Sequence, residues 1–317
     1  MAPHDKRLGR QAGGQRPTTD VVRETAPRVA SLTAEFFLAE AEKAAVAAEN
    51  EGAASGEKEL ATLRLVYRPM WDVRRNALAT YICVPAADAV GGTAMAGEAA
   101  IPGFDNPKMA FELDKLVLQR VIQDLWVLQS TGRKLLLIAP VHFETLASGH
   151  RRQEYIRWCK AIPEESRKLV IFELVAAPDS IPAGRLSGLA AQLRSYSRAV
   201  ILRTSVTSSQ VYPPWETGIF AIGADLSGSD RREGELMKDM NRFVAAAAKS
   251  SLKCYVHGSG SVSLTTAAVG AGFDYIDGDV ITTVVDAPVD GYHFEARNIY
   301  ANPYRHDATP SSGTKVR

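Results

Sequence analysis

Short apolar runs alternate along this chain with longer stretches of amphipathic pattern. Most of the runs lack polar alternation, which is typical of strands buried on both faces of a sheet. The runs cover residues 63–67, 78–84, 134–141, 168–175, 198–206, 218–226, 253–258 and 273–278. We therefore expect about eight strands in this part of the chain.

The stretches between the runs are predicted to be helical. Residues 109–132 carry apolar side chains at helical spacing and end at Gly132, a residue type common at helix C-termini. Residues 184–197 and 234–251 are further helical segments. Strands that alternate with helices predict a TIM-like (β/α)8 barrel. An open, doubly wound sheet is the alternative.

The first two runs differ from the others. Only residues 68–77 separate them, which is too short for a crossover helix but sufficient for a hairpin. The pattern therefore predicts a barrel whose first strand is antiparallel to its neighbours.

The chain on either side of the barrel has a different composition. Residues 1–30 are rich in Gly, Gln, Pro and Thr and cannot build a core, so we expect a disordered leader. Residues 31–60 are predicted to be an N-terminal helix followed by a linker, and Ser31 is a candidate N-cap. The helix would pack on the barrel, or its apolar face with Phe36 and Phe37 would favour a homodimer. The predicted barrel covers 61–290, and 291–317 are predicted to form a C-terminal tail.

Charge and cysteine content restrict the functional class. The 317 residues contain 37 Lys and Arg against 36 Asp and Glu, a balance that argues against binding nucleic acid. The longest apolar stretch, residues 30–48, is interrupted by Glu35, Glu40, Glu42 and Lys43, so no membrane span is expected. The cysteines at 83, 159 and 254 are widely spaced, which predicts reduced, buried thiols and a cytoplasmic location.

Several segments together resemble a known family. In the stretch 65–86, Tyr67, Pro69, Asp72 and Tyr81 match the first hairpin of the EAL family of cyclic di-GMP phosphodiesterases. LDKLVL at 113–118, FEL at 172–174 and GFDYIDGDVI at 272–281 resemble three later segments of that family, in the same order. The resemblance implies a barrel with an antiparallel first strand.

The resemblance also implies which positions would carry the family's chemistry. Its members use two divalent cations, held by carboxylate and amide oxygens at the C-terminal ends of the strands. Of these positions, this chain retains Glu173 and has Asp225 at a further acidic one. The remaining positions correspond to Ile82, Ala86, Ala139, Ala176, Arg203, Thr204, Gly223, His257, Gly260 and Asp277. One retained carboxylate cannot hold two cations, so we predict no metal, no cofactor and no phosphodiesterase activity.

The remaining site residues allow two interpretations. Parallel neighbouring strands bring Glu173 and Arg203 together, which predicts a salt bridge with a structural role. Alternatively, Arg203 and His257 form a small anion site, in which case Glu173, Arg203 and His257 are the ligand-binding candidates. The glycine-rich segment 257–261 is a weak candidate for binding phosphate.

Other polar features are predicted to have no catalytic role. His142, His150 and His293 lack the spacing of metal ligands, so we interpret them as core or solvated histidines. The basic run 150–160 is interpreted as a solvated helix face.

Three functional hypotheses follow. The first is a catalytically inactive regulatory protein in bacterial signalling of the cyclic di-GMP type, which acts through protein partners. The second is an effector that binds cyclic di-GMP or another nucleotide without hydrolysis. The third is a metal-dependent phosphodiesterase with an altered site, in which Glu173, His257 and Asp277 are the candidate acid and base groups.

Overall fold

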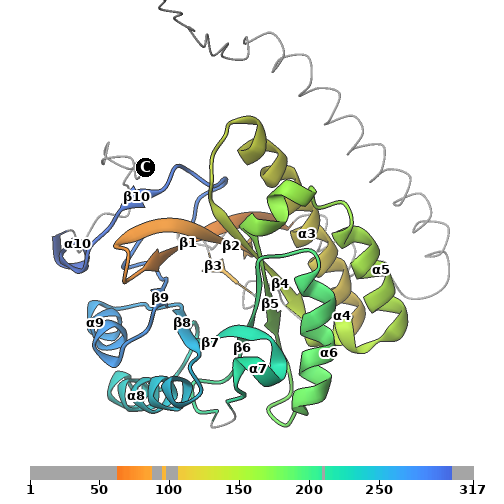
Figure 1. The fold of residues 1–317 in the computed structure, drawn as a ribbon. Coiled ribbons are helices and arrows are strands. Elements are labelled where there is room, and N and C mark those ends of the chain that lie inside the picture. The colour runs from red at the N-terminus through yellow and green to blue at the C-terminus, as the bar shows by residue number, and fades with distance from the viewer. Residues whose placement is uncertain (1–62, 88–94, 98–105, 209–210, 302–317) are drawn as a thin grey trace, which may run out of the picture. The chain divides into compact units, whose positions relative to one another are not determined.

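The computed structural model describes residues 63–87, 95–97, 106–208 and 211–301. In this part of the chain eight strands close into a barrel (Figure 1). They are β1 Arg64–Asp72, β2 Ala77–Ala87, β4 Leu136–His142, β5 Val170–Val175, β6 Ala199–Arg203, β7 Ile219–Asp225, β8 Lys253–His257 and β9 Tyr275–Ile276. Each of them lies in or overlaps one of the predicted apolar runs. The predicted TIM-like barrel is therefore confirmed.

The first strand closes the barrel in the predicted antiparallel sense. β1 pairs antiparallel with β2, where Tyr67 faces Cys83, and antiparallel with β9, where Trp71 faces Ile276. The pairings from β2 through β4 and on to β9 are all parallel. Because β1 joins both edges of the sheet, the alternative of an open, doubly wound sheet is wrong.

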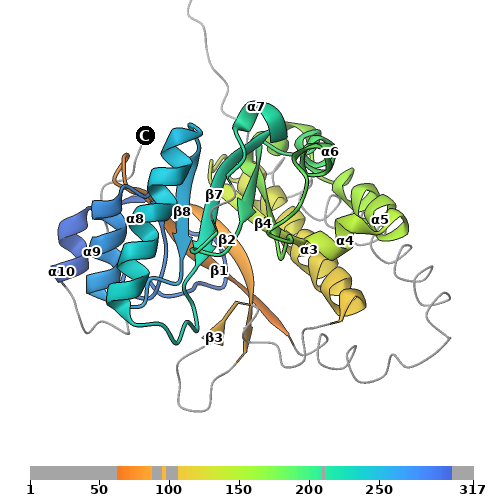
Figure 2. The ribbon, with the colours of Figure 1, turned by 90° about the horizontal axis from the view of Figure 1, so that it is seen from below.

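Helices cover the outside of the barrel. The longest, α3, runs over Pro107–Ser130 and begins at Asn106, whose side chain accepts a hydrogen bond from the Lys108 N–H. The others that surround the strands are α4 Phe143–Ala147, α5 Gly149–Cys159, α6 Ala183–Arg194, α7 Pro214–Thr217, α8 Glu233–Lys249 and α9 Val262–Ala271, with a 3₁₀ helix over Glu164–Leu169. Figure 2 shows α3 to α6 on one side of the strands and α8 and α9 on the other. The pattern predicted α3, α6 and α8, but not α9.

Alternate residues of the strands fill the barrel interior. The buried cluster there is apolar: Val66, Met70, Ile82, Val84, Ala86, Ile138, Ile201, Ala221 and Tyr255. Because side chains of a strand alternate between its faces, the residue two positions after an interior residue also points inward. The polar residues of the site follow this rule, as described below.

The segment after the barrel is folded against it. β10, Tyr292–His293, pairs with β2 at Leu78 and Ala77, and α10 covers Ala296–Ala301. The ring of Phe294 packs edge-on against Trp71, with 5.3 Å between the ring centroids. Residues 291–301, predicted to begin a tail, therefore form part of the fold. Residues 302–317 lie outside the described part of the chain.

Some predictions concern residues that the structure does not describe. The predicted leader at 1–30 and the helix and linker at 31–60 lie outside the described residues. Within the described ranges, no helix is long and apolar enough to cross a membrane. Cys83, Cys159 and Cys254 are unpaired and buried, as predicted.

Candidate functional site

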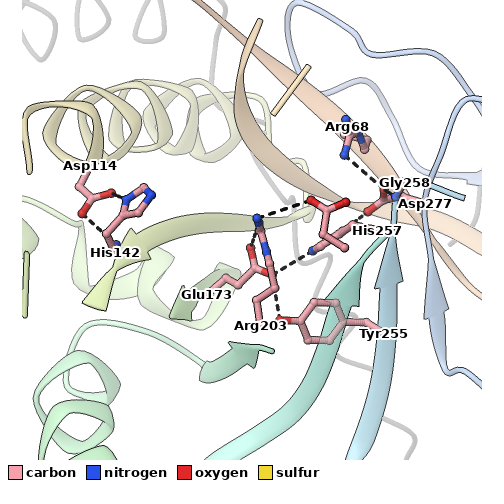
Figure 3. A network of polar contacts seen from close by, with 10 residues as sticks. Arg68, Asp114, His142, Glu173, Arg203, Tyr255, His257, Gly258 and Asp277 are labelled. Atoms are coloured by element: carbon pink, nitrogen blue, oxygen red, sulfur yellow. Dashed lines mark hydrogen bonds and ion pairs between the residues drawn. The ribbon is translucent and has the colours of Figure 1, made fainter. Parts of the chain in front are cut away.

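Five polar side chains meet where the parallel strands end. Glu173 belongs to β5, Arg203 to β6 and His257 to β8, while Asp277 directly follows β9 (Figure 3). Asp225 belongs to β7. Glu173, Arg203 and Asp277 each stand two positions after an apolar residue that packs inside the barrel. The sequential strands of the barrel thus bring together residues that are more than 100 positions apart.

Glu173 and Arg203 form a two-point ion pair. Arg203 Nε lies 3.1 Å from Glu173 Oε1, and Arg203 Nη2 lies 2.6 Å from Oε2. The Glu173 carboxylate is fully buried and the Arg203 side chain is 14% exposed. The structure therefore contains the predicted salt bridge, in the planar geometry that suits a guanidinium and a carboxylate.

Two residues of β8 also donate to the Glu173 carboxylate. Tyr255 Oη donates to Glu173 Oε1 at 2.8 Å, and His257 Nε2 lies 2.9 Å from that oxygen. Tyr255 can occupy this position because residue 223 is a glycine. A Cβ at Gly223 would stand 2.2 Å from the Tyr255 ring. The space that a side chain at residue 223 would occupy is therefore filled by an aromatic ring from the next strand.

His257 links Glu173 to Asp277. Its Nδ1 hydrogen-bonds Asp277 Oδ2, while Asp277 Oδ1 accepts the Gly258 N–H at 3.1 Å. Arg68 Nη1 from β1 lies 3.7 Å from Asp277 Oδ1. At the other end of the network, Arg203 Nη1 lies 3.6 Å from Asp225 Oδ2. Three carboxylates thus face two guanidinium groups and an imidazole.

The buried charges shift one another's titration. Burial works against ionisation of Glu173, but Arg203 and His257 outweigh it and hold the pKa of this carboxyl well below its usual range. Burial also works against the charge on His257, yet Asp277 and Glu173 raise its pKa to about 9. We therefore describe His257 as an imidazolium that donates from both nitrogens, which makes the network electrically balanced at neutral pH.

The remaining predicted positions lie around this network. Ile82 is buried in the apolar cluster inside the barrel. Thr204 follows β6, and its N–H donates to the Gly223 carbonyl at 2.8 Å rather than joining the network. Ala139 is buried on β4, but Ile138 and Pro140 hold the interior positions of that strand. The side chain of Ala139 therefore does not point toward the network.

A hollow at the barrel mouth lies beside the network. One wall is apolar and includes Ile82, Val84 and Leu113. Arg203, Asp225 and His257 contribute to the polar wall. The structure thus places two of the three ligand-binding candidates, Arg203 and His257, at this hollow, while Glu173 lies fully buried beneath them.

The sequence interpretation missed two contributors to this network, Arg68 and Tyr255. Arg68 and Tyr255 lie on strand faces that also carry Val66 and His257, so the two-residue alternation could have identified both. A separate buried cluster joins α3 to β4, since His142 Nδ1 lies 2.7 Å from Asp114 Oδ1. Of the two predicted alternatives, core or solvated, the structure shows His142 as a core histidine, since it is 4% exposed.

The donor set does not suit the two divalent cations that the family resemblance implies. Both oxygens of Glu173 already accept hydrogen bonds from Arg203, and Oε1 also accepts them from Tyr255 and His257. A guanidinium at this distance repels a cation. Among the described residues, no group of three or more His, Cys, Asp or Glu side chains could hold a metal ion.

Comparison with known proteins identifies the fold. No family model matches the sequence, and no curated protein matches it. Solved structures do match. A Bacillus subtilis protein, YkuI, with an EAL domain in complex with substrate cyclic di-GMP and calcium, aligns with a TM-score of 0.58 and 11% identity, over 77% of this chain and 61% of that one. The fold is that of an EAL domain.

Two further EAL domains align over nearly their whole length. One from Listeria monocytogenes aligns with a TM-score of 0.53 and 12% identity, over 75% of this chain and 96% of that one. The FimX EAL domain of Xanthomonas citri, in complex with cyclic di-GMP, gives a TM-score of 0.53 and 14% identity, over 84% and 97% of the two chains. At these identities the likeness concerns the fold.

Proposed function

We propose that this chain is a catalytically inactive EAL-like protein that regulates cyclic di-GMP signalling through contacts with other proteins in the cytoplasm. The observation that carries the proposal is the state of Glu173. Its two oxygens are occupied by donors from Arg203, Tyr255 and His257. With three donors on Oε1 and the Arg203 guanidinium on Oε2, the negative charge of this carboxylate is already balanced, and the guanidinium repels the metal ion that the family's hydrolysis requires.

The apolar wall of the mouth supports the same proposal. Ile82, Val84 and Ala86 stand where the resemblance places a metal carboxylate, a neighbouring apolar residue and a phosphate-holding arginine. All three side chains are buried and belong to the apolar cluster. Binding of a phosphate here would bring a charged group against a surface that offers no donors from these side chains.

Hydrolysis and binding of cyclic di-GMP test the proposal together. The full chain is incubated with cyclic di-GMP and Mg²⁺ or Mn²⁺, and cleavage is followed by chromatography while calorimetry follows binding. We expect neither turnover nor saturable heat. Metal-dependent cleavage that Glu173→Ala abolishes would overturn the proposal and favour an altered phosphodiesterase.

A second function has one observation in its favour. Arg68, Arg203 and His257 all line the hollow at the mouth, and these are residue types that bind phosphate. This arrangement supports an effector that binds cyclic di-GMP or another nucleotide without hydrolysing it. Saturable binding without cleavage, weakened by Arg203→Met, would favour this function over the first.

A further inference from the structure

Basic residues precede three neighbouring strands at the end of the barrel opposite the mouth. Lys134 stands two positions before β4, Lys168 two positions before β5, and Arg198 directly before β6. β5 pairs in parallel with both β4 and β6, so the three strand starts lie side by side (Figure 1). Neighbouring strands are about 4.8 Å apart, so the three starts lie within about 10 Å of one another. Arg167 precedes Lys168, and we call Lys134, Arg167, Lys168 and Arg198 the basic face.

The exposed cations of the basic face have no counter-charges. The side chains of Lys134, Lys168 and Arg198 are exposed, and none forms an ion pair or a hydrogen bond with another described residue. Four other cations at this end of the barrel do have acidic partners: Arg74 and Lys253 pair with Asp274, Arg75 with Asp72, and Arg133 with Asp290. The positive charge of the basic face is therefore directed at solvent.

The fourth cation, Arg167, is held in place by an aromatic ring. Its guanidinium lies over the ring of Tyr196, 5.3 Å from the centroid. A guanidinium that lies over a ring keeps N–H donors in its own plane, and these suit the two oxygens of a carboxylate. Because the ring already orients the side chain, binding of a carboxylate costs less conformational entropy than binding to a freely moving arginine would.

A tyrosine hydroxyl lies beside the basic face. The Tyr275 ring packs against the apolar cluster inside the barrel, and its backbone pairs with Asp72 at this end. Burial raises the pKa of the hydroxyl, while Arg75 and Arg198 act against the rise, which indicates that both guanidinium groups are near the phenol oxygen. The hydroxyl forms no hydrogen bond with another described residue, so it can donate to an acidic group that binds Arg198.

The surroundings of the basic face favour a short acidic segment over nucleic acid or lipid. Glu164 and Glu165 are exposed in the connection that carries Arg167, and they would repel the phosphates of a long nucleic acid. A surface that inserts into lipid needs large apolar side chains beside its cations. None of the exposed large apolar side chains of the described residues lies in the connections 131–135, 160–169 and 195–198.

We propose that the basic face binds an acidic segment of a partner protein. An extended chain advances about 3.3 Å per residue, so carboxylates about three residues apart reach from Lys134 to Arg198. The proposal rests on the protein contacts proposed above and names the chemistry of the partner. The basic face and the mouth lie at opposite ends of the barrel, so each can be tested without the other.

Fluorescence anisotropy of a labelled oligoglutamate peptide, titrated with the full chain, tests the basic face. We expect saturable binding at low salt that high salt removes, and no binding of an oligoglutamine peptide of the same length. Lys168→Glu and Arg198→Glu should each raise the dissociation constant about tenfold, because a repulsion replaces an attraction. Lys238→Glu is the matched control, since it reverses an exposed and unpaired charge on α8, and it should change the constant much less.

Two further probes decide the class of partner. Phosphatidylserine vesicles and duplex DNA are titrated with the same proteins, and circular dichroism shows whether each variant is folded. No peptide binding, an equal effect of Lys238→Glu, or tighter binding to vesicles or DNA that Lys168→Glu weakens would overturn the proposal. These titrations contain no cyclic di-GMP. Failure of this proposal is therefore distinct from failure of the function proposed for the mouth, which would appear as cleavage of cyclic di-GMP.

Discussion

Arg203 on β6 and Glu173 on β5 share two contacts, of 3.1 and 2.6 Å, at the centre of the barrel mouth. The contact is possible because the two strands are adjacent and parallel, with Glu173 paired to Ile201, two positions before Arg203. The guanidinium supplies the positive charge that balances the buried carboxylate. The charge of the Glu173 carboxylate is therefore balanced by a group of the barrel itself.

Removal of the Glu173 charge should destabilise the barrel strongly. Glu173→Gln leaves Arg203 and His257 without their shared counter-charge in a buried site, which we expect to reduce the free energy of unfolding by about 3 to 5 kcal/mol. Urea titration followed by circular dichroism measures the change. Asp72→Asn, which removes a carboxylate paired with the exposed Arg75, is the matched control and should change stability by less than about 1 kcal/mol. Equal effects of the two variants would contradict a stabilising role for the network.

The free energy of unfolding should fall as the pH rises above neutrality. The pKa of His257 is raised to about 9, so the folded chain binds this proton more tightly than the unfolded chain, where the ordinary value is near 6.5. Its contribution to stability is therefore complete below about pH 6.5 and is lost as the pH rises through 9. Urea unfolding at a series of pH values measures this decrease.

The His257→Gln variant is the control for that pH dependence. Without the titrating ring, the decrease between neutral pH and pH 9 should become much shallower. The buried thiols add to the decrease only near pH 9, because burial raises the pKa of Cys83 and Cys254 to about 12 while the unfolded chain ionises them from about pH 8.5, and this share of the slope remains in the variant. A slope that is the same in the variant and in the wild type would show that other groups cause it.

Gly223 should tolerate no side chain. A Cβ there would stand 2.2 Å from the Tyr255 ring, so Gly223→Ala should displace the ring from Glu173 and destabilise the fold by about 1 to 3 kcal/mol. Gly188→Ala is the matched control, because Gly188 lies inside α6 with open space around its Cβ position. That variant should gain about 0.5 to 1 kcal/mol. Urea unfolding of both variants decides the prediction, and a stable Gly223→Ala protein would contradict it.

The segment after the barrel should contribute to the stability of the whole domain. Phe294 is 7% exposed and packs on Trp71, so Phe294→Ala should reduce the free energy of unfolding by about 3 kcal/mol. Tyr300→Ala, at a side chain that is 58% exposed, should have a much smaller effect. Thermal unfolding of the two variants compares them. Similar transitions would mean that the segment is not coupled to the barrel.

The apolar pattern was sufficient to predict the barrel. Strands such as 168–175 are buried on both faces and are therefore uniformly apolar, and the short spacer at 68–77 permits only a hairpin. The pattern was insufficient for residues 291–301. Their strand and helix are short, and Phe294 is buried only because Trp71, more than 200 positions earlier, lies against it. Contacts of this range leave no local signature.

The candidate site, too, was predictable from the sequence only in part. The sequence by itself indicated the residues at the barrel mouth, because the resemblance to the EAL family implies Glu173, Arg203 and His257 as site positions and neighbouring parallel strands bring Glu173 and Arg203 together. Only the tertiary structure decided how these charges are satisfied. The small volume at Gly223 admits Tyr255, and the ends of β8 and β9 hold His257 between Glu173 and Asp277. Those contacts depend on side-chain shape and strand register across the barrel, which no single segment encodes.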